Sequence, residues 1–183
     1  LGFGKAKEVS DAMFQAVNLG KFTFEQLAGS MSVAVPLASQ LGVGFKDLLA
    51  AAATLTTQGF SVSEAMTSIR SAMVAILTPN KQMNQLLERT GFASGEALLR
   101  AKGLQGALEA IREASKGNNQ VLTEAIGRVE GLGAALGLTG KNAGTARQHL
   151  DSVRDSAGAA GKAFEEIDKS TSRQFERLLN NLK

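Results

Sequence analysis

The chain of 183 residues contains no cysteine, no tryptophan and no tyrosine. The lack of cysteine excludes disulfide bonds, thiol nucleophiles and thiolate metal ligands. There is a single histidine, so we expect no zinc peptidase site, because such sites need several nitrogen or sulfur ligands. The chain has only two prolines, Pro36 and Pro79, so few positions interrupt a helix.

The chain also lacks a strong charge bias and a long apolar run. Its net charge is +3, with Lys and Arg interspersed among Asp and Glu, so no specific nucleic-acid partner is expected. The most apolar stretches lie near 33–43 and 48–55, and both fall short of the roughly 18 consecutive apolar residues of a transmembrane helix. No signal peptide is visible at the start.

Small and aliphatic residues dominate what is present. Hydrophobic residues make up 44% of the chain and aromatic residues only 5%, so the core is built mostly of Leu, Ala, Val, Ile and Met. Alanine is the best helix former, and most of the 20 glycines lie between apolar runs, where helices end. We predict an all-α fold. Residue 1 is Leu and the chain ends in a helical pattern, so we expect a segment of a longer protein.

Two near-copies of one motif predict helix reversals: QGFSVSEAM at 58–66 and TGFASGEAL at 90–98. In each copy a glycine suits the left-handed backbone at a helix C-terminus, and a serine follows as the next N-cap. The residues assigned to the reversals are Gly59, Phe60, Ser61, Glu64, Gly91, Phe92 and Ser94. The stretch 37–49 is a looser third copy, so we predict short antiparallel helical hairpins that form a bundle, without a true solenoid repeat.

Further helix ends are predicted from local chemistry. Thr23 and Gln26 have the spacing of a capping box. Pro36 is expected to kink its segment or divide it into two short helices. Thr78 and Pro79 are predicted as a cap followed by proline at the first helical position. The glycine-rich stretch 121–138 fits either one loosely packed helix or two pieces.

The C-terminal part differs from the rest, because no proline occurs from Asn142 to Lys183. Apolar and small residues step there by three and four, which is typical of a coiled-coil seam. The seam residues assigned to self-association are Leu150, Val153, Ala157, Ala160, Phe164 and Ile167. A helix of about 40 residues would be about 60 Å long, so it must leave the domain, bend back or pair with another chain. The glycine-containing stretch 156–161 is its weak point.

The sequence thus divides into a helical-hairpin domain, 1–140, and a long helix with coiled-coil character, 141–183. No residue is assigned a catalytic, cofactor-binding or metal-binding role, no cofactor is expected, and the chain is not expected to be an enzyme. His149 is interpreted as a lone exposed histidine, and Glu165 and Glu166 as solvated side chains opposite the seam.

Glycine-rich motifs in the chain do not match nucleotide-binding fingerprints. Gly131, Gly133 and Gly137 are spaced one residue too long for a dinucleotide fingerprint, and no strand precedes them. Gly140 and Lys141 lack the upstream glycine of a phosphate-binding loop. The spacing of the small residues in these glycine-rich motifs instead favours a close approach of helices or a bend.

The stretch 23–77 contains a T-F-x-x-L-A opening, an L-G-V-x-F-x-x-L-x-A-x-x-A-x-L-T turn and helix, and a G-x-S-x-S-E-A reversal. In this combination it resembles the core region of phage tail tape measure proteins, a family that typically shows these motifs. The corresponding segments here are Thr23 to Ala28, Leu41 to Thr56 and Gly59 to Ala65, with further similar pieces at 101–111 and 138–143. The resemblance extends over nearly the whole chain and is strongest at 41–77.

The resemblance implies a structural role in a phage or prophage tail. Tape measure proteins are long helical chains in the lumen of the tail tube whose length sets tail length. They assemble in the host cytoplasm with the tail tube protein, tail assembly chaperones and distal tail proteins, and they are ejected ahead of the DNA. Self-association through the C-terminal helix is expected in addition.

Two other interpretations remain open. In the first, the Gly/Ala-rich helices of 121–140 contact the host membrane after ejection and assist DNA passage. In the second, the chain is an enzyme with an unfamiliar site at His149 or at the pair Glu165 and Glu166.

Overall fold

The computed structural model describes residues 3–163 and 165, and within these residues it is helical and contains no strand. The all-α prediction is confirmed. The helices are α1 (Phe3–Leu19), α2 (Phe24–Leu41), α3 (Phe45–Thr57), α4 (Val62–Leu77), α5 (Lys81–Thr90), α6 (Gly95–Ala114), α7 (Asn119–Ile126), α8 (Val129–Gly137), the 3₁₀ turn η1 (Gly140–Asn142) and α9 (Ala143–Arg154).

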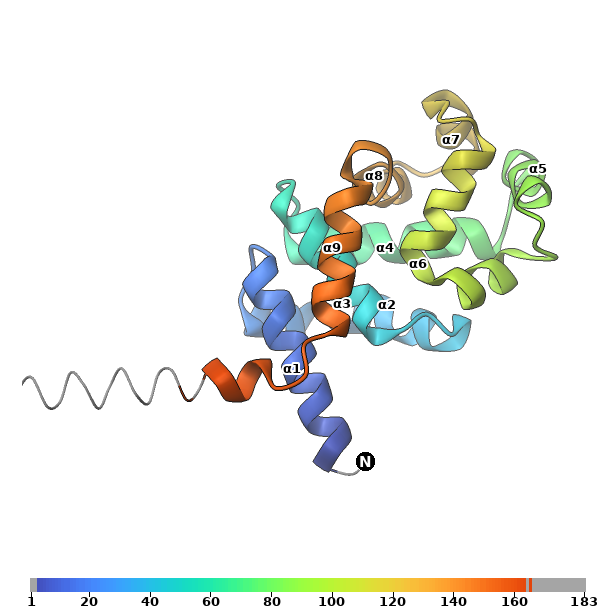
Figure 1. Ribbon diagram of the computed structural model, residues 1–183. Coiled ribbons are helices and arrows are strands. Elements are labelled where there is room, and N and C mark those ends of the chain that lie inside the picture. The colour runs from blue at the N-terminus through green and yellow to red at the C-terminus, as the bar shows by residue number, and fades with distance from the viewer. Residues whose placement is uncertain (1–2, 164, 166–183) are drawn as a thin grey trace, which may run out of the picture.

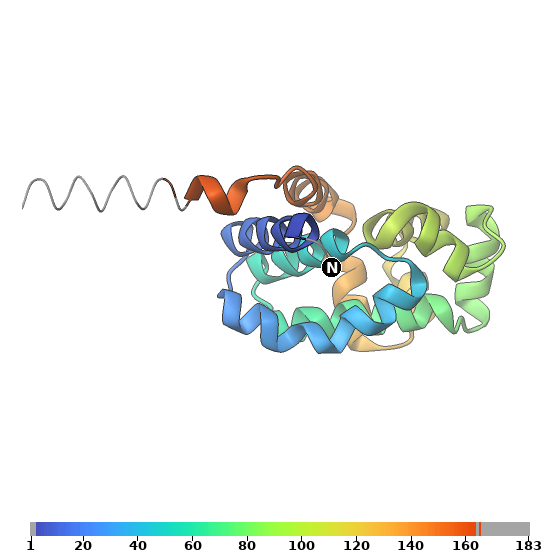
Figure 2. The same cartoon turned by 90° about the horizontal axis from the view of Figure 1, so that it is seen from below.

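Helices α3 and α4 form the centre of the domain (Figures 1 and 2). Every residue of α3 from Asp47 to Thr56 is buried, which a run of four alanines allows because neighbouring helices can approach closely. Helices α1 and α9 pack against α3, whereas α2 and α8 pack against α4. Helix α5 packs against α6 and α7 at the opposite end of the molecule from α1 (Figure 1). The core is therefore one continuous cluster of mainly aliphatic side chains.

Helix α2 begins at the predicted capping box. The Thr23 side chain accepts a hydrogen bond from the backbone N–H of Gln26, and the Gln26 side chain accepts one from the N–H of Thr23. The helix ends at Gly42, whose φ of 71° is the left-handed conformation that glycine adopts without strain.

Of the two alternatives for Pro36, a kink or a division into two short helices, the division is wrong, because α2 continues through Pro36 to Leu41. Proline removes the N–H that would bond the carbonyl of Ser32, but Pro36 and Ser32 are both exposed, so water can reach that carbonyl. On the opposite face Ala34 and Ala38 are buried against the core and hold the helix in place.

Two other local predictions are resolved by the structure. Pro79 does not begin α5; Asn80 is the N-cap, and its side-chain oxygen accepts a hydrogen bond of 2.8 Å from the N–H of Met83. The asparagine satisfies an open backbone donor of α5, whereas Thr78 is the C-cap of α4 and donates its hydroxyl to the carbonyl of Val74. The stretch 121–138 forms two helices, α7 and α8, which are separated at Gly127 with φ of 66°.

The helix expected to run unbroken from Asn142 is interrupted. Helix α9 ends at Arg154, Gly158 has φ of 81°, and helical structure resumes at Ala159. The break lies in the glycine-containing stretch that the sequence indicated as weak. Residues 143–154, which the sequence assigned to the extension, pack against α3 and α1. Four of the six predicted seam residues lie in the described part of the chain, where the helix is broken, and the coiled coil beyond them stays a prediction.

Candidate functional site: the junction of α1, α3 and α9

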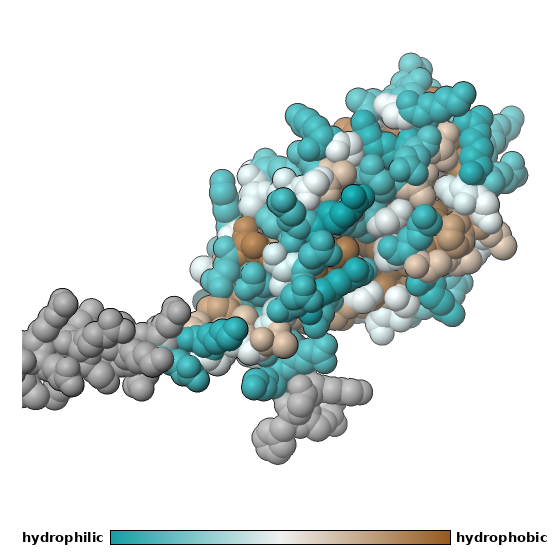
Figure 3. Space-filling view, in the orientation of Figure 1, coloured by the Kyte–Doolittle hydropathy of each residue, from teal (hydrophilic) through white to brown (hydrophobic). Residues whose placement is uncertain are grey.

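The junction is the place where the chain passes from the helical domain to the C-terminal stretch. The short helical stretch that starts at Ala159 lies beside α1 at one end of the molecule (Figures 1 and 2). The surface on the face shown in Figure 3 is mostly hydrophilic, with hydrophobic side chains in separate small patches. Because this face shows no large hydrophobic patch, we identify the junction as the candidate site from its hydrogen bonds and charges.

Asp11 on α1 holds the start of the C-terminal stretch. Its carboxylate is buried, with 3% of the residue exposed, and accepts hydrogen bonds from the N–H groups of Gly158 at 2.8 Å and Ala160 at 3.0 Å. The N–H of Gly158 lowers the pKa of Asp11 most, the N–H of Ala160 and the charges of Lys7 and Lys46 lower it further, and burial opposes them. A carboxylate near helical N–H groups is stabilised in its charged form. Asp11 therefore acts as an N-cap that is supplied by a helix far away along the sequence.

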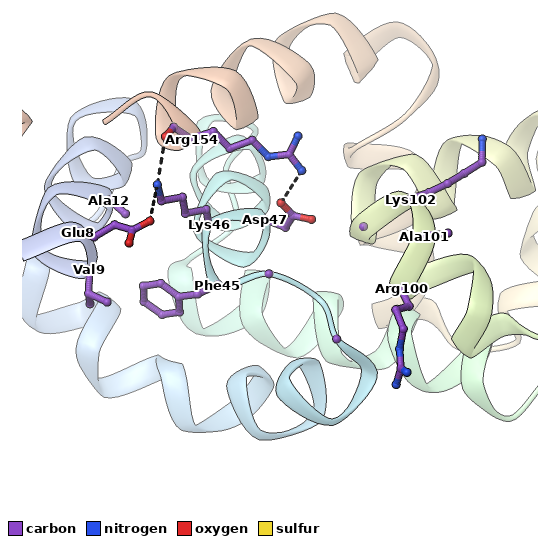
Figure 4. Close-up of a pocket in the computed structure, with 13 residues that line it drawn as sticks. Glu8, Val9, Ala12, Phe45, Lys46, Asp47, Arg100, Ala101, Lys102 and Arg154 are labelled. Carbon is purple, nitrogen blue, oxygen red and sulfur yellow. Dashed lines mark hydrogen bonds and ion pairs between the residues drawn. The ribbon is translucent and has the colours of Figure 1, made fainter. Parts of the chain in front are cut away.

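Lys46 on α3 holds the end of α9. Its ammonium group donates a hydrogen bond of 3.1 Å to the carbonyl oxygen of Arg154 and lies 3.0 Å from a carboxylate oxygen of Glu8 on α1 (Figure 4). The Arg154 guanidinium pairs with Asp47 on α3 at 3.0 Å. A cation at the last carbonyl of a helix is favourable, and so is Asp47 in the first turn of α3. The four charged side chains thus connect α1, α3 and α9.

A cleft of about 760 Å³ opens beside these ion pairs. Its walls include Phe45 and Val9 on one side and residues of α6 on the other (Figure 4). Arg100 and Lys102 belong to this second wall, but their side chains point away from Asp47 (Figure 4). Arg100 pairs instead with Glu96 at 2.9 Å. In the part of the chain that the structure describes, no three His, Asp or Glu side chains are grouped to hold a metal ion.

His149 is not exposed, and that prediction is wrong. The ring is half-buried on α9, and its Nδ1 lies 3.0 Å from the hydroxyl oxygen of Thr54 on α3. Because the Thr54 hydroxyl donates its proton to the carbonyl of Ala50 at 2.8 Å, Nδ1 of His149 carries the proton and donates to Thr54. Burial lowers the pKa of His149. The contact joins α9 to α3.

The residues assigned to the helix reversals lie at helix ends. Gly59, with φ of 103°, precedes α4, and Gly91, with φ of 78°, ends α5. Ser94 caps α6 by accepting from the N–H of Ala97. Phe60 and Phe92 are half-buried and pack against the core.

Ser61 and Glu64 form the capping box at the start of α4. The Ser61 hydroxyl oxygen accepts from the N–H of Glu64 at 3.2 Å, and the Glu64 carboxylate accepts from the N–H of Ser61 at 2.8 Å and from its hydroxyl at 2.7 Å. The hydrogen bond from the N–H of Ser61, followed by that from its hydroxyl, lowers the pKa of Glu64.

The seam residues do not share one helix in the structure. Leu150 and Val153 lie on α9, and Val153 is fully buried within the domain. Ala157 and Ala160 lie beyond the end of α9, on either side of Gly158. The remaining two, Phe164 and Ile167, lie outside the described residues, as does Glu166, whereas Glu165 is exposed. Self-association through the seam stays a prediction.

The glycines of α8 allow it to approach α3 and α4. A Cβ atom at Gly131 would lie 3.1 Å from the backbone nitrogen of Ala72, and one at Gly133 would lie 3.2 Å from the ring of Phe60. At Gly137 a Cβ atom would overlap Leu55. Among the helices that the structure describes, none combines the length and the apolar character needed to span a membrane.

Sequence reasoning missed Asp11 and Lys46, because their partners lie more than 100 residues away along the chain. One signal was available: the break at 156–161 contains no side chain spaced as a local capping box, so its open N–H groups required a partner from elsewhere.

Comparison with known proteins supports one family. The family model for the phage-related minor tail protein matches residues 2–129, which is more than half of the chain and includes α1 to α7. Neither the curated proteins nor the solved structures gave a match.

Proposed function

The chain belongs to the phage-related minor tail protein family, and we propose that it is a segment of a tape measure protein. As a member of this family it is a structural protein of the phage tail, located in the virion and associated with other tail proteins. The observation that carries the finer proposal is the junction. A helical domain holds, by charged side chains from two of its helices, the start of a chain that continues beyond it.

The proposed role is non-enzymatic and depends on the length of the chain. A helix rises about 1.5 Å per residue, so the number of residues that follow the junction can be converted into distance. In this proposal the tail tube protein polymerises around the chain in the host cytoplasm, with tail assembly chaperones, and the chain then lies in the tube lumen next to distal tail proteins. It leaves the tail ahead of the DNA.

A change of residue count in the phage gene tests this proposal. A second copy of residues 156–183 inserted after Lys183 adds 28 residues, and we expect tails longer by about 42 Å if the added residues are helical. Electron microscopy of purified particles measures the change. A matched control with Glu165→Gln keeps the residue count and alters one exposed side chain, so its tails should have the parental length. Parental tail length in the duplication variant would contradict the proposal.

The membrane-active alternative predicts a different result. Helices α7 and α8 would have to leave α5 and α4, against which they pack, before they could enter a bilayer. If deletions within 142–183 leave tail length unchanged but abolish infection, and the chain makes lipid vesicles leak, the role lies in the host envelope instead.

A further inference from the structure

The break after α9 replaces one particular helix hydrogen bond. In a continuous helix the N–H of Gly158 would donate to the carbonyl of Arg154, four residues earlier. In the structure the N–H of Gly158 donates to Asp11, and the carbonyl of Arg154 accepts from Lys46. Both halves of the missing bond are thus satisfied by charged side chains from two other helices.

A second helix hydrogen bond, two residues further on, is replaced in part by Asp11. The N–H of Ala160 would donate to the carbonyl of Ser156, but it donates to the second carboxylate oxygen of Asp11. The carbonyl of Ser156 accepts from the N–H of Ala159 instead. Asp11 therefore holds, with its two oxygens, two N–H groups that a continuous helix would use.

Gly158 and Gly161 weaken a continuous helix through the break, but nothing in the local chain prevents one. It contains no proline, and the left-handed backbone at Gly158 is a conformation that glycine can exchange for a helical one. The hydroxyl of Ser156 is buried without a hydrogen-bond partner among the described residues, which disfavours the bent conformation. The local chain is thus compatible with both conformations, and the side chains of other helices select the bend.

The sequence pattern also fits a continuous helix. Leu150, Val153, Ala157 and Ala160 keep the spacing of three and four residues across the break, so in a continuous helix they would lie on one face. The bend separates the first two, on α9, from Ala160 in the next helical stretch.

We propose that Asp11 and Lys46 form a latch, defined as these two side chains and their hydrogen bonds to Gly158, Ala160 and Arg154, which holds the chain in a bent conformation. When the latch is released, residues 143–163 form one continuous helix with the seam on one face. The switch changes the direction in which the chain leaves the domain. Its effect on tail length rests on the proposed function, but the switch itself can be tested on the purified chain.

A distance measurement tests the latch. The chain has no native cysteine, so spin labels can be attached at Gln148→Cys and Lys162→Cys, two exposed positions on either side of the break. In a continuous helix their Cα atoms are 14 residues apart, which is about 21 Å. With the native latch, we expect the label pair to give a single distance. In the double variant Asp11→Ala and Lys46→Met, we expect most molecules to shift to the distance of the continuous helix.

Two comparison variants keep the test decisive. Asp151→Asn removes an exposed carboxylate of α9 outside the latch, and it should keep the native distance. Asp11→Asn keeps the shape and one acceptor oxygen, so it should populate both distances even if the double variant fails to fold. An unchanged distance in both Asp11 variants, or a broad distribution without the helical distance, would overturn the latch. Neither result bears on whether the chain is part of a tail.

Discussion

The chain contains two breaks that are held in different ways. At the reversal before α4, Ser61 and Glu64 supply both halves of the cap from within four residues. At the break after α9, Asp11 and Lys46 supply them from distant helices. The segments that follow also differ: α4 is anchored by fully buried side chains such as Ile69, whereas Lys162 is exposed. A locally capped break next to the core is fixed with the fold, but a remotely held break can change without unfolding the domain.

The largest expected effect contrasts the two segments that follow the breaks. Ile69→Ala should lower the free energy of unfolding by about 2–5 kcal/mol, because it removes buried methyl groups and leaves a cavity. Lys162→Ala should change it by less than about 0.5 kcal/mol. Urea denaturation followed by circular dichroism measures both. Equal losses would mean that the two segments are anchored alike.

A smaller effect is expected at the local cap. Ser61→Ala should lower the free energy of unfolding by about 1 kcal/mol, because the N–H of Glu64 loses its acceptor. Ser63→Ala, which alters another exposed serine of the first turn, serves as the control and should have a much smaller effect. If both variants unfold at the same urea concentration, the capping box does not stabilise α4.

Acid should affect the remote break with little effect on the core. The pKa of Asp11 is lowered from 3.8, so its hydrogen bonds stabilise the bent conformation above that pH. This contribution is lost as the pH falls below 3.8 through the lowered pKa. The Gln148 and Lys162 label pair should then show both distances at low pH, with a larger share of the helical one than at neutral pH, and Asp11→Asn should remove this pH dependence.

The local cap provides a comparison in the same titration. The pKa of Glu64 is also lowered, from 4.5, so the Ser61 amide should shift in NMR spectra as the pH falls through it. No change in the label distance should accompany that step. A pH-dependent distance that persists in Asp11→Asn would contradict the role of Asp11.

The local features were readable from the sequence because their determinants are close together. The all-α class follows from the alanine and leucine content, and the cap of α2 follows from Thr23 and Gln26. The sequence could not decide whether Pro36 kinks or divides its segment, because the continuation of α2 depends on which face of the helix is exposed. The partial burial of His149 was also missed, since Thr54 lies 95 residues away.

The junction could not be predicted for the same reason. Asp11 lies on a helix whose pattern indicates only an amphipathic face, and nothing near residue 11 identifies Gly158 as its partner. The spacing of the seam indicated a continuous helix, whereas the charges of α1 and α3 favour a bend. Tertiary hydrogen bonds favour one of two conformations that the local sequence allows.

The way the latch grips the chain has a mechanical consequence. A tensile load applied beyond residue 163 reaches the hydrogen bonds of Asp11 before it reaches the apolar contacts of α3 and α4, because the two sets of contacts lie in series along the chain. Under such a load the hydrogen bonds of Asp11 break first, and the domain stays folded. The junction thereby limits the force that the C-terminal stretch transmits to the domain.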